Sequence, residues 1–91
     1  MIIKMSLLGN SLGTRSDAEK LRIEILKSEE MCVLDFADVS IVSNSFADEL
    51  LGIIVRDFGM KTLKEKVILR SANVEVSATI RTAILNRAMA T

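Results

Sequence analysis

The chain has 91 residues, of which 49% are hydrophobic and 26% are charged, and its twelve basic and twelve acidic residues cancel. These values predict one folded domain that spans residues 1–91, and they argue against disorder. The zero net charge excludes the strongly basic surface with which proteins bind nucleic acid or an anionic membrane, so we expect neither partner.

The residue types also limit the chemistry, because the chain has one cysteine and no histidine. A metal site would depend on carboxylates alone, and Cys32 lies in an apolar run where it is expected to be buried and unreactive. We therefore expect no metal, no cofactor and no enzymatic activity. Residues 1–8 are too short for a secretion signal, and no stretch approaches about 20 apolar residues, so we expect a cytoplasmic protein.

In the first third of the chain, residues 2–8 begin with β-branched side chains, which predicts a short strand, and two glycines make residues 9–13 a loop. Ser16 and Glu19 have the spacing of a capping box, in which two side chains satisfy free backbone N–H groups at a helix start. A helix is therefore predicted over residues 17–27.

In the middle third, residues 31–36 are almost continuously apolar. This pattern is typical of a central strand that is covered on both faces, by helices or by a second subunit. A second helix is predicted to begin at Ser45 and to end at Gly59, which suits the left-handed backbone of a helix C-cap. Its buried face is predicted to consist of Phe46, Leu50, Ile53, Ile54 and Phe58.

In the last third, residues 61–66 predict a solvated connector or a short helical turn, and residues 67–69 predict a third strand. Asn73 is predicted to cap a final helix. Its buried stripe is predicted to consist of Val76, Ile80, Ala83, Ile84 and Ala88. Strands that alternate with helices predict an α/β fold, with a mostly parallel sheet of three to four strands and helices packed on it.

The junction between the middle strand and the second helix carries the main candidate residues, Ser43, Asn44, Ser45, Asp48 and Glu49. In the simpler interpretation, Ser45 or Asn44 caps the helix and one of the two acids completes a capping box. In the functional interpretation, Ser45 is exposed to a partner and accepts a phosphate, which adds up to about two negative charges. Because the nearby acids would repel these charges, phosphorylation is expected to break a contact.

Asp35 and Asp38 follow the predicted middle strand, where aspartate is typical of a turn or of a bond to a loop amide. Together with the loop from Gly9 to Arg15, they define an alternative, a small nucleotide- or anion-binding protein or enzyme. A homo-oligomeric assembly module is a third interpretation, favoured by the apolar composition and the zero net charge. Six basic side chains in the second half of the chain are predicted to be solvated: Arg56, Lys61, Lys64, Lys66, Arg81 and Arg87.

The segment from Val33 to Gly52 resembles the STAS domains of bacterial anti-sigma factor antagonists. It is more similar still to a small bacterial family of STAS-like domains of unknown function. The strings that carry the resemblance are Val33-Leu34-Asp35-Phe36, Val39, Ser43-Asn44-Ser45-Phe46-Ala47-Asp48-Glu49-Leu50, Val67-Ile68-Leu69, and Ile80 with Ile84-Leu85-Asn86-Arg87-Ala88.

The resemblance implies a regulatory protein-binding module. In the antagonists, a partner kinase with a histidine-kinase-type ATPase fold, itself an anti-sigma factor, phosphorylates a serine at the start of the second helix and thereby releases the domain. Ser45 falls at that position. The antagonists usually have an acid two residues before the serine and a glycine after it, where this chain has Ser43 and Phe46. The expected partner-binding residues are Ser43, Asn44, Ser45, Asp48 and Glu49.

Overall fold

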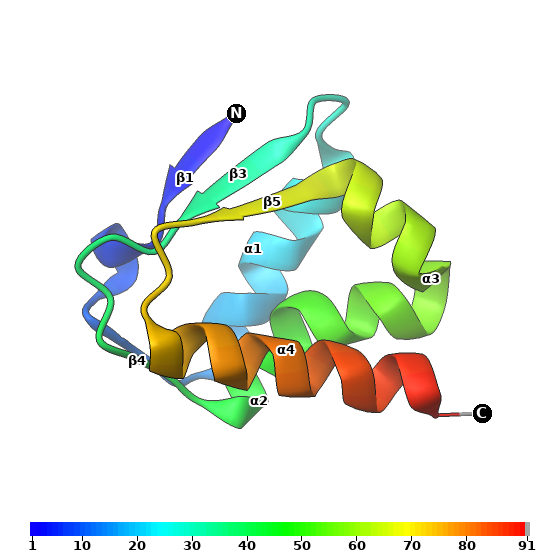
Figure 1. Cartoon of the computed structure of the whole chain (residues 1–91). Helices are drawn as coiled ribbons and strands as arrows, with labels where there is room; N and C mark the ends of the chain where they lie inside the picture. The colour runs from blue at the N-terminus through cyan, green and yellow to red at the C-terminus, as the bar shows by residue number, and fades with distance from the viewer. Residues whose placement is uncertain (91) are drawn as a thin grey trace.

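The computed structural model describes residues 1–90 and has an α/β architecture (Figure 1). Strands and helices alternate along the chain, which confirms the predicted fold class. In chain order the elements are β1 (Ile2–Lys4), the 3-10 helix η1 (Met5–Leu8), β2 (Ser11–Leu12), α1 (Arg15–Lys27), β3 (Cys32–Asp35), β4 (Ile41–Val42), α2 (Asn44–Ala47), the π-helical turn η2 (Asp48–Gly52), α3 (Ile53–Lys66), β5 (Val67–Arg70) and α4 (Val74–Met89).

The main sheet has the strand order β1-β3-β5, and both pairs of strands are parallel. This confirms the predicted mostly parallel sheet and the central position of the middle strand. A second parallel pair, β2 with β4, was not predicted. Each of its strands has only two residues, which is too short for an alternation of apolar and polar side chains to be visible in the sequence.

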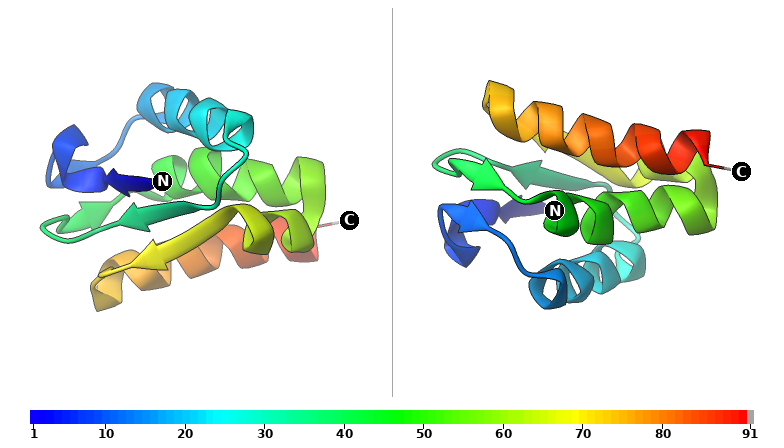
Figure 2. Two further views of the ribbon diagram at one scale, coloured as in Figure 1. Left: turned by 90° about the horizontal axis from the view of Figure 1, so that it is seen from above. Right: turned by 90° about the horizontal axis from the view of Figure 1, so that it is seen from below.

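All the helices lie on one face of the main sheet, as the views from above and from below show (Figure 2). Cys32 and Leu34 of β3 point to this face and are fully buried. On the opposite face, Ile2 and Ile68 flank Val33 in register and are 57% and 46% exposed. The prediction that helices cover both faces of this strand is therefore wrong for residues 1–90, and coverage by a second subunit stays a prediction.

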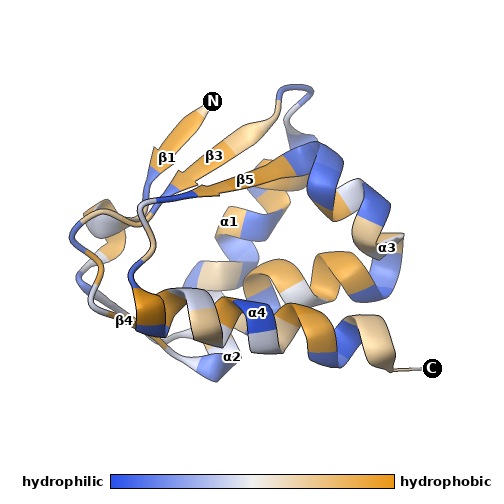
Figure 3. Ribbon diagram, in the orientation of Figure 1, coloured by the Kyte–Doolittle hydropathy of each residue, from blue (hydrophilic) through white to orange (hydrophobic). Residues whose placement is uncertain are grey.

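The core lies between the sheet and the helices. In Figure 3, β1, β3 and β5 are coloured mainly as hydrophobic. Phe46 and Leu50 are buried as predicted, whereas Phe58 is 55% exposed. Ile53 and Ile54 are buried as predicted too, and Phe58 lies in the last turn before the helix is interrupted at Gly59. Ala88, in the last turn of α4, is also exposed, although it was predicted to belong to the buried stripe.

The helix ends confirm some of the predicted caps and correct others. The Asn73 side chain accepts a hydrogen bond of 2.7 Å from the Val76 N–H, as predicted for the last helix. The φ angle of Gly59 is 88°, which interrupts α3 and leaves residues 60–66 as a short helical segment. The predicted capping box of the first helix is absent from the described chain, since α1 begins at Arg15 and its N-cap is Thr14.

Candidate functional site

Ser43, and not Ser45 or Asn44, is the N-cap of the helix that follows β4. Its hydroxyl oxygen accepts a hydrogen bond of 3.0 Å from the Phe46 N–H, and the hydroxyl donates to the Gly13 carbonyl at 3.1 Å. The prediction erred by one or two residues, because β4 ends at Val42 and the extended backbone of Ser43 already has the conformation of a cap. Ser43 therefore has a structural role.

Ser45 is the second residue of α2, and the cap at Ser43 leaves its hydroxyl without a structural task. Its side chain is half-buried, and within residues 1–90 the hydroxyl makes no hydrogen bond. Asn44, which precedes it, is exposed. These two polar side chains are therefore available for contacts with another molecule.

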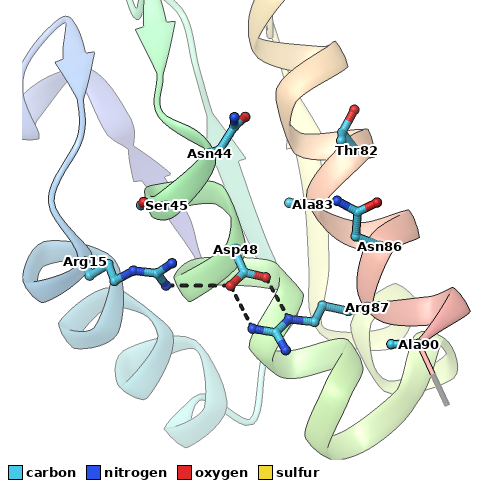
Figure 4. A pocket seen from close by; sticks show the side chains of 9 residues that line it. All are labelled: Arg15, Asn44, Ser45, Asp48, Thr82, Ala83, Asn86, Arg87 and Ala90. Atoms are coloured by element: carbon cyan, nitrogen blue, oxygen red, sulfur yellow. Dashed lines mark hydrogen bonds and ion pairs between the residues drawn. The ribbon is translucent and has the colours of Figure 1, made fainter.

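A groove of about 420 Å³ lies between α2 and α4, and Figure 4 shows the side chains that line it. Asn44 and Ser45 come from α2, Thr82 and Asn86 from α4, and Arg15 from the start of α1. We call it the α2–α4 groove. Hydroxyl, amide and guanidinium groups therefore meet in it, which suits a polar or anionic segment of a binding partner. The full lining is Arg15, Asn44, Ser45, Asp48, Thr82, Ala83, Asn86, Arg87 and Ala90.

Asp48 lies at the base of this groove and is held by two arginines (Figure 4). Arg87 donates from Nε to Oδ1 and from its NH2 nitrogen to Oδ2, both at 2.8 Å, and a nitrogen of Arg15 lies 3.6 Å from Oδ2. The side chain is only 20% exposed. The hydrogen bonds from Arg87, more than the other contacts, lower the pKa of Asp48. Asp48 is thus neither a capping-box acid nor a free surface acid, which corrects both predictions.

Glu49 faces α1 rather than the groove. Its carboxylate lies 2.6 Å from a nitrogen of Arg22 and 3.1 Å from one of Arg15, and Arg22 also donates to its carbonyl. The side chain is 18% exposed, and the hydrogen bond from Arg22 is the main cause of a lowered pKa. Glu49 therefore joins α1 to η2. It is not the exposed acid that was expected, and its contact with a partner stays a prediction.

Gly52 permits this arrangement of charges. A Cβ atom built at Gly52 would clash with Oδ1 of Asp48 and would lie 3.1 Å from Cγ of Arg87. Only glycine leaves room for the ion pair to cross the π-helical turn. π-helical turns inside α-helices occur frequently at functional sites, and this one carries both Asp48 and Glu49.

The secondary candidates are divided among three places. Asp35 ends β3 on the open sheet face, where it accepts a hydrogen bond of 3.0 Å from the Ala37 N–H and lies 3.0 Å from an Arg70 nitrogen. The Ala37 amide, followed by Arg70, lowers its pKa. Asp38 is exposed in the next turn, with a φ of 66°. Arg15 is the first residue of α1, directly after the loop that begins at Gly9, and it forms ion pairs with Asp48 and Glu49 of η2.

These positions matter for the predicted alternative site. Arg15 forms ion pairs with the carboxylates of Asp48 and Glu49, and Asp35 forms one with Arg70. Neither residue is therefore a free ligand-binding group at the predicted alternative site. Residues 1–90 contain no cluster of three or more His, Cys, Asp or Glu side chains that could hold a metal ion. In the same residues, no helix has the length and apolar character needed to cross a membrane.

The α4 side of the groove was not predicted from the sequence. Arg87 was predicted to be solvated, yet it is the main partner of Asp48. Its position four residues after the buried Ala83 places it beside the buried stripe of α4, and this spacing is the signal that could have identified it. Thr82 and Asn86 carry no comparable signal, because they are ordinary polar residues of an amphipathic helix.

The chain matches the model of a known protein family. The model of a family described as a STAS-like domain of unknown function (DUF4325) matches residues 17–77, which is more than half of the chain. These residues include the cap at Ser43, the candidate Ser45 and the carboxylates of η2. No curated protein and no solved structure matches significantly.

Proposed function

Because the chain belongs to the family of STAS-like domains, we propose that it is a non-catalytic, cytoplasmic regulatory module that binds another protein. In this proposal the partner is a histidine-kinase-type ATPase, and it contacts the start of α2 and the α2–α4 groove. Ser45 accepts a phosphate from the partner, and the phosphate ends the contact.

One observation carries the proposal, namely the position of the Ser45 hydroxyl. It lies in the first turn of α2, it lines the α2–α4 groove, and no group within residues 1–90 bonds to it. Since Ser43 already caps the helix, the fold does not need this hydroxyl. A partner could therefore bind it, and a kinase could modify it, without loss of the cap.

The charges around Ser45 supply a reason for release. A phosphate on Ser45 would add up to about two negative charges to a groove that already contains Asp48. It would also compete with Asp48 for the guanidinium groups of Arg15 and Arg87, since arginine binds phosphate in the same two-pronged manner as carboxylate. The groove that the partner contacts would change in both charge and shape.

The residues of the alternative site give less support to a small-molecule function. Arg15 is bound by carboxylates and Asp35 by Arg70, so an anion or nucleotide would first have to break these ion pairs. The partner-binding proposal needs no such rearrangement, because the side chains of Asn44 and Ser45 form no hydrogen bond among the described residues.

The experiment is phosphosite mapping. The purified protein is incubated with Mg-ATP and the histidine-kinase-type ATPase encoded nearest to its gene, and its peptides are analysed by mass spectrometry. We expect phosphate on Ser45 and none on the Ser45→Ala variant. Phosphate on a different serine, or on none, would contradict the proposed role.

A further inference from the structure

A second groove, of about 440 Å³, lies beside the free edge of β5. Leu69 of β5 and Ile80 and Ile84 of α4 are among its apolar lining residues, and only Ser77 and Arg81 contribute polar side chains. Figure 2 shows β5 at the edge of the sheet with α4 alongside it. We call it the β5–α4 groove. It shares no lining residue with the α2–α4 groove, so it is a separate surface.

The backbone of β5 has unused hydrogen-bonding groups on this side. The Arg70 carbonyl accepts a hydrogen bond of 2.8 Å from the Phe36 N–H, so the backbone groups of Arg70 and of Ile68 point toward β3. Since these groups alternate in direction along a strand, the N–H and C=O of Leu69 and the C=O of Val67 point away from β3. The N–H of Val67 is not part of this free edge, because it donates to the Leu63 carbonyl at the end of α3. β5 is the last strand of the sheet order, and within residues 1–90 no strand pairs with this edge.

We infer that this edge binds an extended peptide segment of a partner, which adds a strand to β5. The free N–H and C=O groups of Leu69 bind the peptide backbone, while its side chain and those of Ile80 and Ile84 receive an apolar side chain of the peptide. Strand addition to a sheet edge beside a helix is a general mode of peptide recognition, in which the backbone supplies affinity and side-chain pockets supply specificity. An exposed apolar strand edge is otherwise a site of aggregation.

The charges indicate that the segment is acidic at its flanks. Arg81 is the only charged residue that lines the groove, and within residues 1–90 it forms no ion pair. A second copy of the chain fits less well. In the antiparallel register that pairs Val67 of one copy with Leu69 of the other, Arg70 of one copy would lie opposite Lys66 of the other, and like charges in that position are destabilising.

The test uses two fluorescein-labelled peptides, Glu-Glu-Ile-Thr-Val-Thr-Glu-Glu and the same sequence with lysine in place of glutamate. Binding is followed by fluorescence anisotropy, and the site is mapped by amide shifts in nuclear magnetic resonance. We expect the acidic peptide to bind with micromolar affinity, to shift the amides of Val67, Leu69 and Ile84, and to bind at least tenfold more tightly than the lysine peptide. Equal affinities, or shifts confined to other residues, would overturn the inference.

Two pairs of variants separate the contribution of the backbone hydrogen bond at Leu69 from the contribution of the Arg81 charge. Leu69→Pro and Leu69→Ala both lose the side chain, but only proline removes the outward N–H, and an edge strand tolerates proline at such a position. We expect at least a tenfold weaker affinity for Leu69→Pro than for Leu69→Ala, with the fold checked by circular dichroism. Arg81→Glu should weaken binding of the acidic peptide at least tenfold, whereas Lys20→Glu on the exposed face of α1 should not.

Two outcomes count against the inference whatever the stability of the proline variant. If Arg81→Glu binds the acidic peptide as tightly as the unmodified protein does, the charge argument is wrong. If sedimentation shows a dimer that Arg81→Glu leaves intact and Leu69→Pro dissociates, a second copy occupies the edge and the peptide assignment is wrong.

Discussion

Asp48 and Arg87 are 39 residues apart in the chain, and their side chains form two parallel hydrogen bonds of 2.8 Å each. The pair joins the π-helical turn of the central helix to the last turns of α4 and forms the base of the α2–α4 groove (Figure 4). On the other side of the same turn, Glu49 binds Arg22 of α1. Two adjacent acids therefore hold α4 and α1 against one central element, and several predictions depend on this arrangement.

Gly52→Ala should disrupt the ion pair between Asp48 and Arg87, because the new methyl group would occupy the space of Oδ1. We expect the free energy of unfolding to fall by about 1–3 kcal/mol, as for other overpacked sites. Gly13→Ala is the matched control, since a Cβ atom there meets nothing within 4 Å. Urea denaturation measures both. Equal stability of the two variants would show that the space around Gly52 is not limiting.

Asp48→Asn should weaken the attachment of α4, because the neutral amide accepts a weaker hydrogen bond from Arg87 than the carboxylate does. Removal of this charge-assisted pair, in which the Asp48 side chain is 20% exposed, should reduce the free energy of unfolding by roughly 1–2 kcal/mol. Asp57→Asn breaks an ion pair of similar length, between the exposed Asp57 and Arg56, and should change stability little. A loss for Asp57→Asn as large as for Asp48→Asn would contradict this assignment.

The stability of the domain should decrease in acid. Hydrogen bonds lower the pKa values of Asp35, Asp48 and Glu49 in the folded protein, chiefly from the Ala37 amide, from Arg87 and from Arg22 respectively. The unfolded chain, with ordinary carboxyl pKa values of about 4, therefore binds more protons than the folded chain as the pH falls.

The stabilisation is thus fully present above the ordinary pKa values and is lost as the pH drops through the lowered ones. We expect urea midpoints that are level between pH 7 and roughly pH 5 and that fall steadily below pH 4. Asp48→Asn should show a shallower fall, because one of the carboxyl groups with a lowered pKa is absent. An identical pH dependence for the variant and the unmodified protein would show that Asp48 does not contribute.

Ser43 and Ser45 should differ in their effects on folding. Ser43→Ala removes the side chain that caps the helix and should cost about 1 kcal/mol of stability. Ser45→Ala should be close to neutral, because its hydroxyl makes no hydrogen bond among the described residues and alanine favours a helix. Thermal unfolding of the two variants checks this difference. The reverse order of stabilities would restore Ser45 as the cap and remove the basis of its proposed role.

The strands and helices were predictable where they depend on the spacing of residues that are close together in the sequence. The apolar run before Asp35 predicted the central strand, and the 3.6-residue spacing of Val76, Ile80 and Ala83 predicted α4 together with its cap at Asn73. These features arise from neighbours in sequence.

The details of the site were less predictable, because they depend on contacts between distant residues. Ser43 became the cap because β4 ends one residue earlier, and β4 exists only through its pairing with β2. The exposed acids expected at Asp48 and Glu49 are neutralised by arginines from α4 and α1. The spacing of Arg87 after Ala83 indicates that it lies beside the buried stripe of α4, but it does not indicate which acid Arg87 pairs with. The π-helical turn that allows these pairings has no local signature either.

The central claim, that the Ser45 hydroxyl is where a protein partner is bound and released, is tested most directly by partner affinity. Ser45→Glu places a negative charge at the second position of α2, and Ser16→Glu places the same charge at the second position of α1, where serine is exposed. Binding of both variants to the histidine-kinase-type ATPase is measured by isothermal titration calorimetry. The account predicts at least a tenfold loss of affinity for Ser45→Glu and none for Ser16→Glu. Unchanged affinity of Ser45→Glu would contradict it.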